Sequence, residues 1–314
     1  MSATHADMMR YLYTPLSNYT ENGGKRHRPL ICILACQAVG GEPEQAYVAA
    51  AAIEHFHTAA LIHDDIADES ELRRGMPCMH IALGEGLAIN AGDLALSLLT
   101  SMVLGDATMS DSTKLRVLGE FVNMAARTVE GQALDIGWAR EGRFDITLDD
   151  YLTMASHKTA FYSGGVPLAV GAIVGGGSEE QIEALRTYGM NTGLAFQIHD
   201  DLLNLIGGKE KVAKDFRSDI TEGKRTIIAV HALANTQGAL HDELLSLLAS
   251  KATDPAQLER AVQIMGEAGS LEFARTYATD LVHEHQQIIK DALPSSIYRD
   301  LLLSMGDFFV SRIK

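Results

Sequence analysis

The sequence of 314 residues predicts an all-α protein, a single large helix bundle of roughly ten or more helices. Alanine, leucine, methionine and glutamate dominate the composition, and these residues favour helices. Apolar residues recur at helical spacing nearly everywhere, while the alternation of β-branched and aromatic residues that indicates strands is scarce. The breaks between the periodic segments are short, which suits helices that pack side by side in one bundle.

Each helix is predicted from a periodic segment between two breaks. The segment from Ala46 to Asp68 contains no Gly or Pro and predicts one long helix. Further helices are expected at 87–104, 112–132, 148–163, 179–205, 226–234, 241–248, 255–268, 271–292 and 296–310. The one long polar connection runs from Gly207 to Lys224. No composition shift marks a boundary, so residues 1–314 are expected to form a single domain.

The composition excludes several classes of protein. With 26 Lys and Arg against 41 Asp and Glu, the net charge of −15 argues against a nucleic-acid binder. Hydrophobic residues at 46% exclude disorder as the main state. Three cysteines form no ligand pattern and cannot all pair, which favours a reduced cytoplasm. No signal segment precedes the helices and no apolar stretch reaches the ~20 residues of a membrane span, so we expect a cytoplasmic protein that does not span a membrane.

Two similar acidic segments lie on opposite sides of the middle of the chain. The segment LIHDDIAD, which contains Asp64 and Asp68, is echoed by QIHDDLLN, which contains Asp200 and Asn204. Carboxylates four residues apart on a helix project from one face. A solvated acidic helix end is the ordinary alternative, but its repetition in apolar surroundings favours a site for a divalent metal ion. Mg²⁺ is held by one or two carboxylates together with phosphate oxygens, so two such clusters facing each other would hold a diphosphate.

Two concentrated groups of cations stand out in this acidic chain. The segment from Gly23 to Pro29, GGKRHRP, joins a flexible backbone to basic side chains and to a proline that opens a helix, a combination typical of an anion site. Arg73 and Arg74 follow the first acidic segment and can hold phosphate oxygens bidentately. Scattered surface cations are the ordinary alternative for either group alone, and the presence of both favours anion binding.

Other residues are candidates for the site, but each is weak evidence when taken alone. They are His57, Lys158, Thr159, Gln197, Lys214 and Lys224. A lone helical histidine such as His57 is more often a core residue than a ligand. Lys158 lies in an apolar helical stretch, where burial of an unpaired charge is costly. Lys214 and Lys224 lie in the polar connection, where lysines are usually solvated.

Together these segments resemble those of the trans-type isoprenyl diphosphate synthases, the polyprenyl synthetase group that includes farnesyl and geranylgeranyl diphosphate synthases. The similarity comprises, in the order of the family, GGKRHRP at 23–29, EHFHTAALIHDDIADESELRRG at 54–75, AINAGD at 88–93, HKTA at 157–160, FQIHDDLLN at 196–204 and KDFRSDITEGKRT at 214–226. The DDxxD motif alone is weak evidence, whereas the ordered set is specific and spans most of the chain. The resemblance implies an isoprenoid synthase bundle around a central apolar tunnel.

The resemblance also implies roles for individual residues. Lys25, Arg28, His57 and Arg74 are expected to hold isopentenyl diphosphate. Asp64, Asp68 and Asp200 are expected to bind Mg²⁺. Asp65 and Asp201 are expected in part to support these ligands without contacting the metal ion. Arg73, Lys158, Gln197, Lys214 and Lys224 are expected to contact the allylic diphosphate, and Lys158, Thr159 and Gln197 to stabilise a carbocation. Asn204 departs from the usual Asp of the family, which weakens the outer position of the second cluster.

These residue types suit the reaction that the resemblance implies. Ionisation of an allylic diphosphate separates a carbocation from a highly charged leaving group, which Mg²⁺ and cationic side chains stabilise. The cation then adds to isopentenyl diphosphate and a proton is lost, with water excluded. The expected protein is therefore a Mg²⁺-dependent prenyltransferase that uses isopentenyl diphosphate and dimethylallyl, geranyl or farnesyl diphosphate. The family is usually homodimeric, so a homodimer is expected by resemblance only.

Three other functions stay open at this point. A class I terpene cyclase uses similar acidic clusters but needs no second diphosphate site, so Lys25, Arg28 and Arg74 argue against it. Glu54 and His57 form half of a di-iron carboxylate site, but no second Glu-x-x-His segment is found. A regulatory synthase-like subunit would be free to lose both clusters, yet they are nearly complete.

Helix geometry addresses the length of the product. Ala60 and Ala59 lie four and five residues before Asp64, so the first turn beneath the diphosphate presents only methyl groups. The first bulky residue on that wall is Phe56, about 12 Å below Asp64 at 1.5 Å per residue. If Phe56 forms the floor of the tunnel, the product is geranylgeranyl diphosphate rather than farnesyl or a longer polyprenyl diphosphate. The alternative is that Phe56 is a core aromatic turned away from the tunnel.

Overall fold

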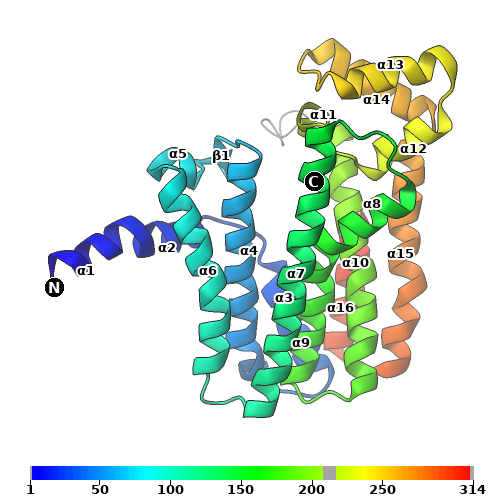
Figure 1. Cartoon of the computed structure of the whole chain (residues 1–314). Coiled ribbons are helices and arrows are strands. Elements are labelled where there is room, and N and C mark those ends of the chain that lie inside the picture. The colour runs from blue at the N-terminus through cyan, green and yellow to red at the C-terminus, as the bar shows by residue number, and fades with distance from the viewer. Residues whose placement is uncertain (1, 208–216, 312–314) are drawn as a thin grey trace. The chain divides into compact units, whose positions relative to one another are not determined.

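The computed structural model describes residues 2–207 and 217–311, and these are almost entirely helical, which confirms the all-α prediction (Figure 1). Helices α1 to α16 span Ala3–Met8, Thr14–Glu21, His27–Ala38, Tyr47–Ala67, Met79–Leu83, Glu85–Gly105, Asp111–Glu141, Leu148–Ala155, Val166–Val174, Glu179–Ile206, Ser218–Glu222, Ile227–Asn235, Gly238–Ala249, Pro255–Glu267, Ser270–Ala292 and Ile297–Ser311. The π-helices η1 and η3 span Met9–Tyr13 and Ser156–Gly165, and the 3₁₀-helix η2 spans Pro43–Ala46. Strands β1 (Leu72–Arg73) and β2 (Met76–Pro77) form an antiparallel pair.

The described chain forms two compact units. Unit 1 comprises residues 2–121 and 170–178, and unit 2 comprises residues 122–169, 179–207 and 217–311. Helices α7 and α9 each contribute to both units. The sequence shows no composition shift at these divisions, and the expectation of a single domain stays a prediction.

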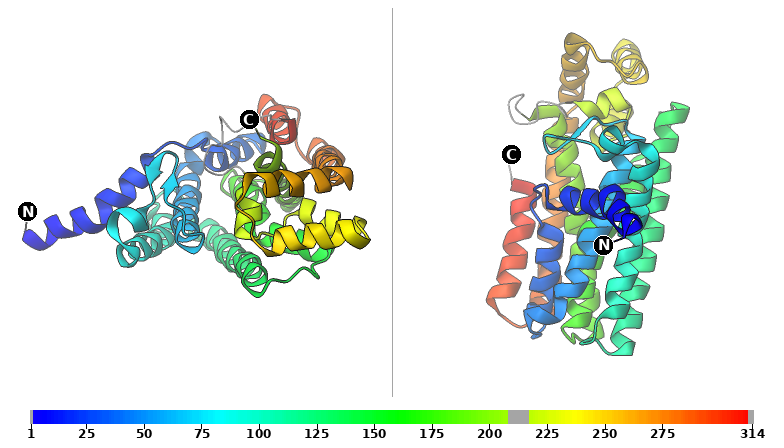
Figure 2. Two further views of the ribbon diagram at one scale, coloured as in Figure 1. Left: turned by 90° about the horizontal axis from the view of Figure 1, so that it is seen from above. Right: turned by 90° about the vertical axis from the view of Figure 1, so that its left-hand side faces the viewer.

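In unit 1, α4 and α6 lie side by side, and an arm of α1, η1 and α2 extends from them (Figure 2). Small residues line the contact, so that the two backbones approach closely. The apolar cluster there consists of Leu16, Ala59, Ile62, Met79, Ala88, Ala91 and Ala95. Helix α4 begins after η2, whose first turn is closed by a capping box between Glu42 and Gln45, and it ends at the acidic segment. The fold therefore places the first acidic cluster at the C-terminus of a well-packed helix.

Helix α6 bears on the expectation that no segment spans a membrane, which stays a prediction. It is the one helix among the described residues that is long and apolar enough to cross a membrane, with a mean hydropathy of 1.6 over its most apolar window. The unbroken apolar runs of α6 are short, because Asn90 and Asp93 interrupt them, but the hydropathy averaged over the helix stays high. A core helix of a soluble protein passes the same test, and α6 packs along α4.

In unit 2, α10 packs against η3, α15 and α16 (Figure 1). Its contact with η3 is so close that a Cβ at Gly164 would lie 2.0 Å from the Gly189 carbonyl oxygen. The core around it is mainly aliphatic, with side chains from α8, α10, α11, α12, α13, α14 and α15, and it includes the ring of Tyr151. The backbone of η3 is thereby fixed against the helix that carries the second acidic segment.

Several element boundaries differ from the prediction. Helix α7 continues to Glu141 rather than 132, because Gly131 does not end the helix: a Cβ there would lie 2.2 Å from the Lys158 backbone nitrogen, so this glycine permits close packing. The helix expected at 148–163 is α8 followed by the π-helix η3. The polar connection contains α11, and α3 begins at His27, two residues before Pro29. The hairpin β1–β2 and helices α1, α2, α5 and α9 were not predicted.

Candidate active site

The first acidic cluster lies on the last turn of α4. Asp64 and Asp68 are partly exposed, and the backbone N–H of Asp68, the residue that caps the helix, donates to the Asp64 carbonyl oxygen at 2.8 Å. Both carboxylates therefore lie near solvent one turn apart, as the spacing predicts. Hard oxygen donors in this arrangement suit a divalent cation.

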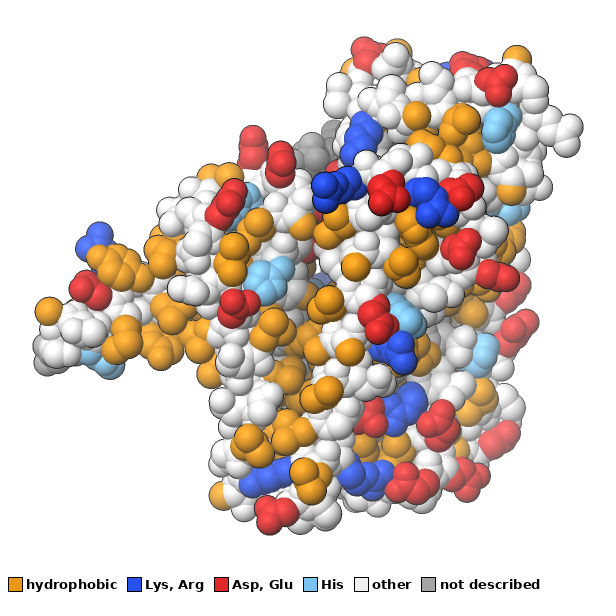
Figure 3. All heavy atoms as spheres, viewed as in Figure 1, with side chains coloured by type: hydrophobic (Ala, Val, Ile, Leu, Met, Phe, Trp, Pro, Cys, Tyr) orange, Lys and Arg blue, Asp and Glu red, His pale blue; other side chains and the backbone are white. Residues whose placement is uncertain are grey.

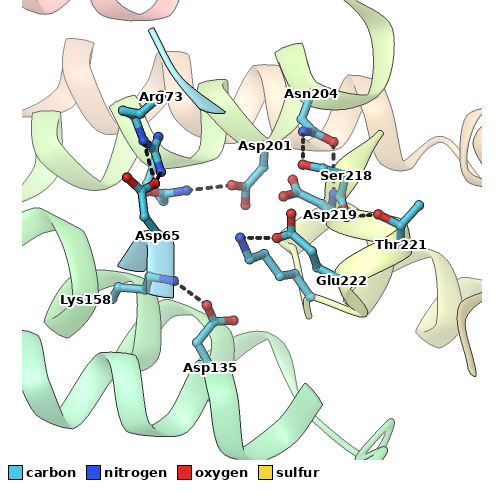
Figure 4. A network of polar contacts seen from close by, with 12 residues as sticks. Asp65, Arg73, Asp135, Lys158, Asp201, Asn204, Ser218, Asp219, Thr221 and Glu222 are labelled. Atoms are coloured by element: carbon cyan, nitrogen blue, oxygen red, sulfur yellow. Dashed lines mark hydrogen bonds and ion pairs between the residues drawn. The ribbon is translucent and has the colours of Figure 1, made fainter. Parts of the chain in front are cut away.

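Asp65, between them, is buried and has other partners. Arg73 Nε donates to Asp65 Oδ1 at 2.8 Å (Figure 4), and the Tyr19 hydroxyl donates to Oδ2 at 2.7 Å. Burial and the hydrogen bond to Asp65 raise the pKa of Tyr19 well above its ordinary value. Burial lowers the pKa of Arg73, but the hydrogen bond to Asp65 and the negative charge of Asp65 together outweigh burial and raise the pKa overall. Contact between Arg73 and the allylic diphosphate stays a prediction.

Arg74 is positioned by the β1–β2 hairpin. Its φ of 53° and the φ of 79° at Gly75 are those of a two-residue type I′ turn, whose twist matches a tight hairpin. The Arg74 Nη1 group donates to the carbonyl oxygens of Asn22 and Gly23, both at 3.0 Å. The guanidinium covers Gly24 so closely that a Cβ there would lie 2.8 Å from Nη2. The glycine-rich segment thus provides the space that Arg74 occupies.

The basic residues of unit 1 gather around His57. Arg28 is buried on α3, and its Nη1 lies 3.1 Å from His57 Nε2. Burial, followed by the charges of Arg28, His27, Arg74 and Arg73, holds the pKa of His57 well below its usual range. A neutral imidazole can accept a hydrogen bond from the guanidinium. Lys25 is exposed, so the structure gathers Arg28, His57 and Arg74 while Lys25 remains at the surface.

Arg26 has a different function from its basic neighbours. It adopts a left-handed φ of 51° and donates to the Glu54 carboxylate on α4 and to the Thr20 carbonyl oxygen. It therefore fastens the start of α3 to α2 and α4. The sequence distinguishes this anchor from Lys25 and Arg28 only through the family pattern.

Unit 2 contains a pocket of about 70 Å³. Its lining includes both site residues that the sequence predicts and residues that it does not. It is lined by Asp135, Tyr151, Met154, Ala155, Lys158, Thr159, Gln197, Asp201, Asp219, Lys224, Arg225 and Thr226. Lys158 forms an ion pair with Asp135 on α7 (Figure 4), which explains how a lysine is tolerated in an apolar helix. Thr159 Oγ1 donates to Gln197 Oε1 at 2.8 Å. The three residues expected to stabilise a cation therefore share one polar pocket.

Asp200 and Asn204 on α10 differ in environment. Asp200 is partly exposed, whereas the Asn204 side chain holds the first turn of α11 (Figure 4). Its Nδ2 donates to Ser218 Oγ at 3.1 Å, and its Oδ1 accepts from the Asp219 backbone N–H at 3.3 Å. The outer position of the second cluster thus fastens α11 to α10. Burial raises the pKa of Asp219 to about 7 against the opposing charge of Lys224, which also pairs with Glu222.

The remaining predicted residues are placed as follows. Phe56 and Ala59 are buried on α4, and Ala60 is partly buried. Lys214 lies outside the described residues. Their part in chain length or in diphosphate binding stays a prediction.

Sequence reasoning missed Tyr19, Asp135, Tyr151, Asp219 and Arg225. The available signal was an ionisable side chain in an apolar helical segment, which needs a partner when it is buried. For Asp135 that signal points to Lys158, whose own burial in an apolar stretch was noticed. Nothing in the sequence pairs the tyrosines with their acidic partners, because those pairs join distant segments.

Comparisons with known proteins show the family of the chain. The sequence profile of the polyprenyl synthetase family matches residues 9–265. A short chain isoprenyl diphosphate synthase of Methanothermobacter thermautotrophicus is 40% identical over 92% of this chain and 87% of its own length. A geranylfarnesyl diphosphate synthase of Natronomonas pharaonis is 36% identical over 96% of this chain and 90% of its own.

Solved structures give the same assignment. The geranylgeranyl pyrophosphate synthetase of Pyrococcus horikoshii superposes with a TM-score of 0.90 at 35% identity, over 96% of this chain and 90% of that one. The geranylgeranyl pyrophosphate synthase of Corynebacterium glutamicum, complexed with isoprenyl diphosphate and magnesium, gives 0.87 at 29% identity, over the same shares. A match of this extent, with the acidic clusters and the basic residues in place, identifies the chain as a prenyltransferase that belongs to the polyprenyl synthetase family.

Proposed function

We propose that the enzyme condenses isopentenyl diphosphate with an allylic diphosphate, head to tail and in the trans configuration. The observation that carries the proposal is the gathering of Arg28 and Arg74 around the neutral His57 in unit 1, on the same helix, α4, whose last turn carries Asp64. A cyclase handles one diphosphate, and a second group of cations separate from the acidic cluster supports a second diphosphate. The pocket of unit 2 supplies the polar oxygens of Thr159 and Gln197 for a developing cation.

The donor set fits Mg²⁺ as cofactor. No group of three or more His, Cys, Asp or Glu side chains able to hold a metal ion by itself occurs among the described residues. Asp64 and Asp68 instead offer two hard oxygen donors, which is the number that Mg²⁺ commonly takes from protein when phosphate oxygens complete its shell. Asp64, Asp68 and Asp200 would hold Mg²⁺, and when bound it would neutralise charge on the leaving diphosphate. The Corynebacterium relative with magnesium supports this assignment.

We favour geranylgeranyl diphosphate as the product. Ala60 and Ala59, four and five residues before Asp64, carry only methyl groups and are partly buried and buried on α4, and Phe56 is buried further along the helix. A floor at Phe56 lies about 12 Å below Asp64, which leaves space for a longer chain than a floor one turn higher. The names of the relatives support a product of about this length, since they include geranylgeranyl and geranylfarnesyl synthases.

The proposed assembly is a homodimer. Leu115, Val122, Val129 and Ile136 recur every seven residues on α7 with exposed fractions of 72, 71, 68 and 41%. Exposed Gly119, Ala126 and Ala133 alternate with them, so the stripe presents large side chains and gaps at the spacing of a helix-packing seam. Figure 3 shows hydrophobic side chains at the surface over this helix. A second copy offers the matching stripe, and the double variant Val122→Lys, Val129→Lys should sediment as a monomer while Ile297→Lys, at an exposed site on α16, should not.

We also propose that the protein is cytoplasmic and does not span a membrane. The net charge of −15 and an odd number of cysteines support a reducing aqueous compartment. Helix α6, although apolar enough to span, carries Glu85 and Asp93 and lies beside α4. Fractionation of expressing cells should recover the protein in the supernatant without detergent.

One incubation tests the reaction. The protein, Mg²⁺ and labelled isopentenyl diphosphate are combined with dimethylallyl, geranyl or farnesyl diphosphate in turn, and dephosphorylated products are separated by chromatography. Geranylgeraniol from all three starters, abolished by EDTA, is the expected result. Hydrocarbon formed from an allylic diphosphate alone would indicate a cyclase, and no product in any arm would indicate a regulatory subunit.

A further inference from the structure

Tyr151, on α8, takes no part in the function described so far. It is 1% exposed and lines the pocket of unit 2. Its hydroxyl donates to Asp201 Oδ2 at 2.8 Å, a bond wholly inside the protein. Burial of a hydroxyl and a carboxyl group together is costly unless each satisfies the other. The pair is therefore a fixed point in the wall of the pocket.

A chain of hydrogen bonds leads from this fixed point to Thr159. The other oxygen of Asp201, Oδ1, accepts from Gln197 Nε2 at 2.7 Å. Because the nitrogen end of the amide faces Asp201, its oxygen end faces Thr159, whose hydroxyl donates to it at 2.8 Å. The proton of Thr159 is thus directed at Gln197, and the lone pairs of its Oγ1 remain for the pocket.

We propose that Tyr151 is a positioning residue for the ionisation step, because it fixes Asp201 and through it the direction of the Gln197 amide and the Thr159 hydroxyl. The inference rests on the proposed function, in which these two side chains meet a developing carbocation. A cation is stabilised by oxygen lone pairs and destabilised by N–H or O–H hydrogens. Without the Tyr151 hydroxyl, Asp201 can rotate and the amide can turn over, which presents hydrogens to the cation. The effect concerns charge in the transition state, so it belongs to kcat rather than to binding.

The variant Tyr151→Phe isolates the hydroxyl, since the ring and its packing in the core of unit 2 are kept. We expect kcat to fall about tenfold or more, with both Michaelis constants within about twofold of the parent values. Tyr188→Phe is the matched control. Tyr188 is 2% exposed on α10, and its hydroxyl donates to the Leu302 carbonyl oxygen at 3.1 Å, so the control also loses one buried hydrogen bond. An unchanged kcat in Tyr151→Phe, or an equal fall in both variants, would overturn the proposal.

A second measurement does not depend on turnover. The side-chain amide protons of Gln197, assigned in NMR spectra by comparison with Gln197→Met, should shift in Tyr151→Phe and stay unchanged in Tyr188→Phe. An unshifted amide would overturn the inference even if the enzyme were inactive on every diphosphate. In kinetics, Tyr151→Phe should cause no further loss on the Gln197→Met background, because residues that act as a unit are not additive. Additive losses would show that Tyr151 acts independently of the chain. A parent enzyme without synthase activity, together with the expected NMR shift, would contradict the proposed function and leave the chain of hydrogen bonds in place.

Discussion

Arg73 donates from both Nε and Nη2 to a single oxygen, Oδ1, of Asp65. The central acid of the first cluster is thus used to hold the β1–β2 hairpin against the end of α4, with Tyr19 on its other oxygen. Its neighbours Asp64 and Asp68 remain partly exposed. One segment of the chain therefore contains both metal-binding candidates and a structural ion pair, and these roles should separate by mutation.

Removal of Arg73 should reduce stability. Arg73→Ala leaves the carboxylate of Asp65 buried without its charge partner, which costs about 3 kcal/mol in free energy of unfolding. Urea denaturation followed by circular dichroism measures this cost. On that background, Asp65→Asn removes the buried charge and should recover part of the loss. Equal stability of Arg73→Ala and the parent would contradict the importance of the pair.

Substitution of Arg74, or of Gly24, which the Arg74 guanidinium covers, should weaken the binding of isopentenyl diphosphate. Arg28→Ala and Arg74→Ala should raise the Michaelis constant for this substrate, since each loses charge-assisted contacts. Gly24→Ala should do the same, because its Cβ would displace the Arg74 guanidinium. Gly40→Ala is the matched control: its φ of 98° is close to the 102° of Gly24, but open space surrounds it. The control should lose stability alone, and a raised Michaelis constant there would show that backbone strain is responsible.

Both acidic clusters should be required for turnover. Asp64→Ala and Asp200→Ala should each lower kcat by orders of magnitude with helical content kept, because each removes charge stabilisation in the transition state. Asp280→Ala, at an exposed acid on α15, is the control for net charge. Asn204→Asp should change turnover only modestly, since Asn204 is engaged with Ser218 and Asp219. Near-normal turnover without Asp64 or Asp200 would refute the metal assignment.

The partly buried His57 should make stability depend on pH. Its folded-state pKa is depressed by burial and by Arg28, so between pH 7.5 and 5.5 the unfolded chain takes up a proton that the folded protein does not. The free energy of unfolding therefore falls as pH is lowered through about 6.5, by at most about 1.4 kcal/mol per pH unit from this group. In His57→Gln this contribution is absent. Identical pH dependence of the parent and the variant in urea denaturation would contradict a neutral His57.

The chain length of the product should depend on the sizes of the side chains at positions 56 and 60 of α4. Phe56→Ala should lengthen the product beyond twenty carbons, and Ala60→Phe should shorten it to fifteen, because the first lowers the proposed floor and the second raises it. Chromatography of dephosphorylated products gives the distribution. If both variants give the parent product, Phe56 is a core residue and the floor lies elsewhere.

The sequence predicts some levels of this structure better than others. Long helices such as α4, α6 and α10 were predicted because their apolar periodicity is uninterrupted, and the basic and acidic site residues were found because their spacing is local. The hairpin at Arg74 was missed because its signal is one Arg-Gly pair. The Lys158–Asp135 and Tyr151–Asp201 pairs were missed because tertiary packing joins segments that the sequence does not associate. The role of Asn204 depends on α11, a helix of five residues without a periodic pattern.

The π-helix η3 limits which insertions and deletions this enzyme can tolerate. Such a stretch holds more residues per turn than an α-helix, and Lys158 and Thr159 lie within it. Deletion of one residue on the N-terminal side of Lys158 would let the stretch relax towards an ordinary α-helix. It would also rotate the residues after the deletion by about 100° about the helix axis relative to those before it. Either the pair would leave the pocket or Gly164 would lose its contact with Gly189 on α10. A deletion in η3 could therefore yield a fold as stable as the parent yet without its chemistry, so length variation among functional descendants should be confined to loops.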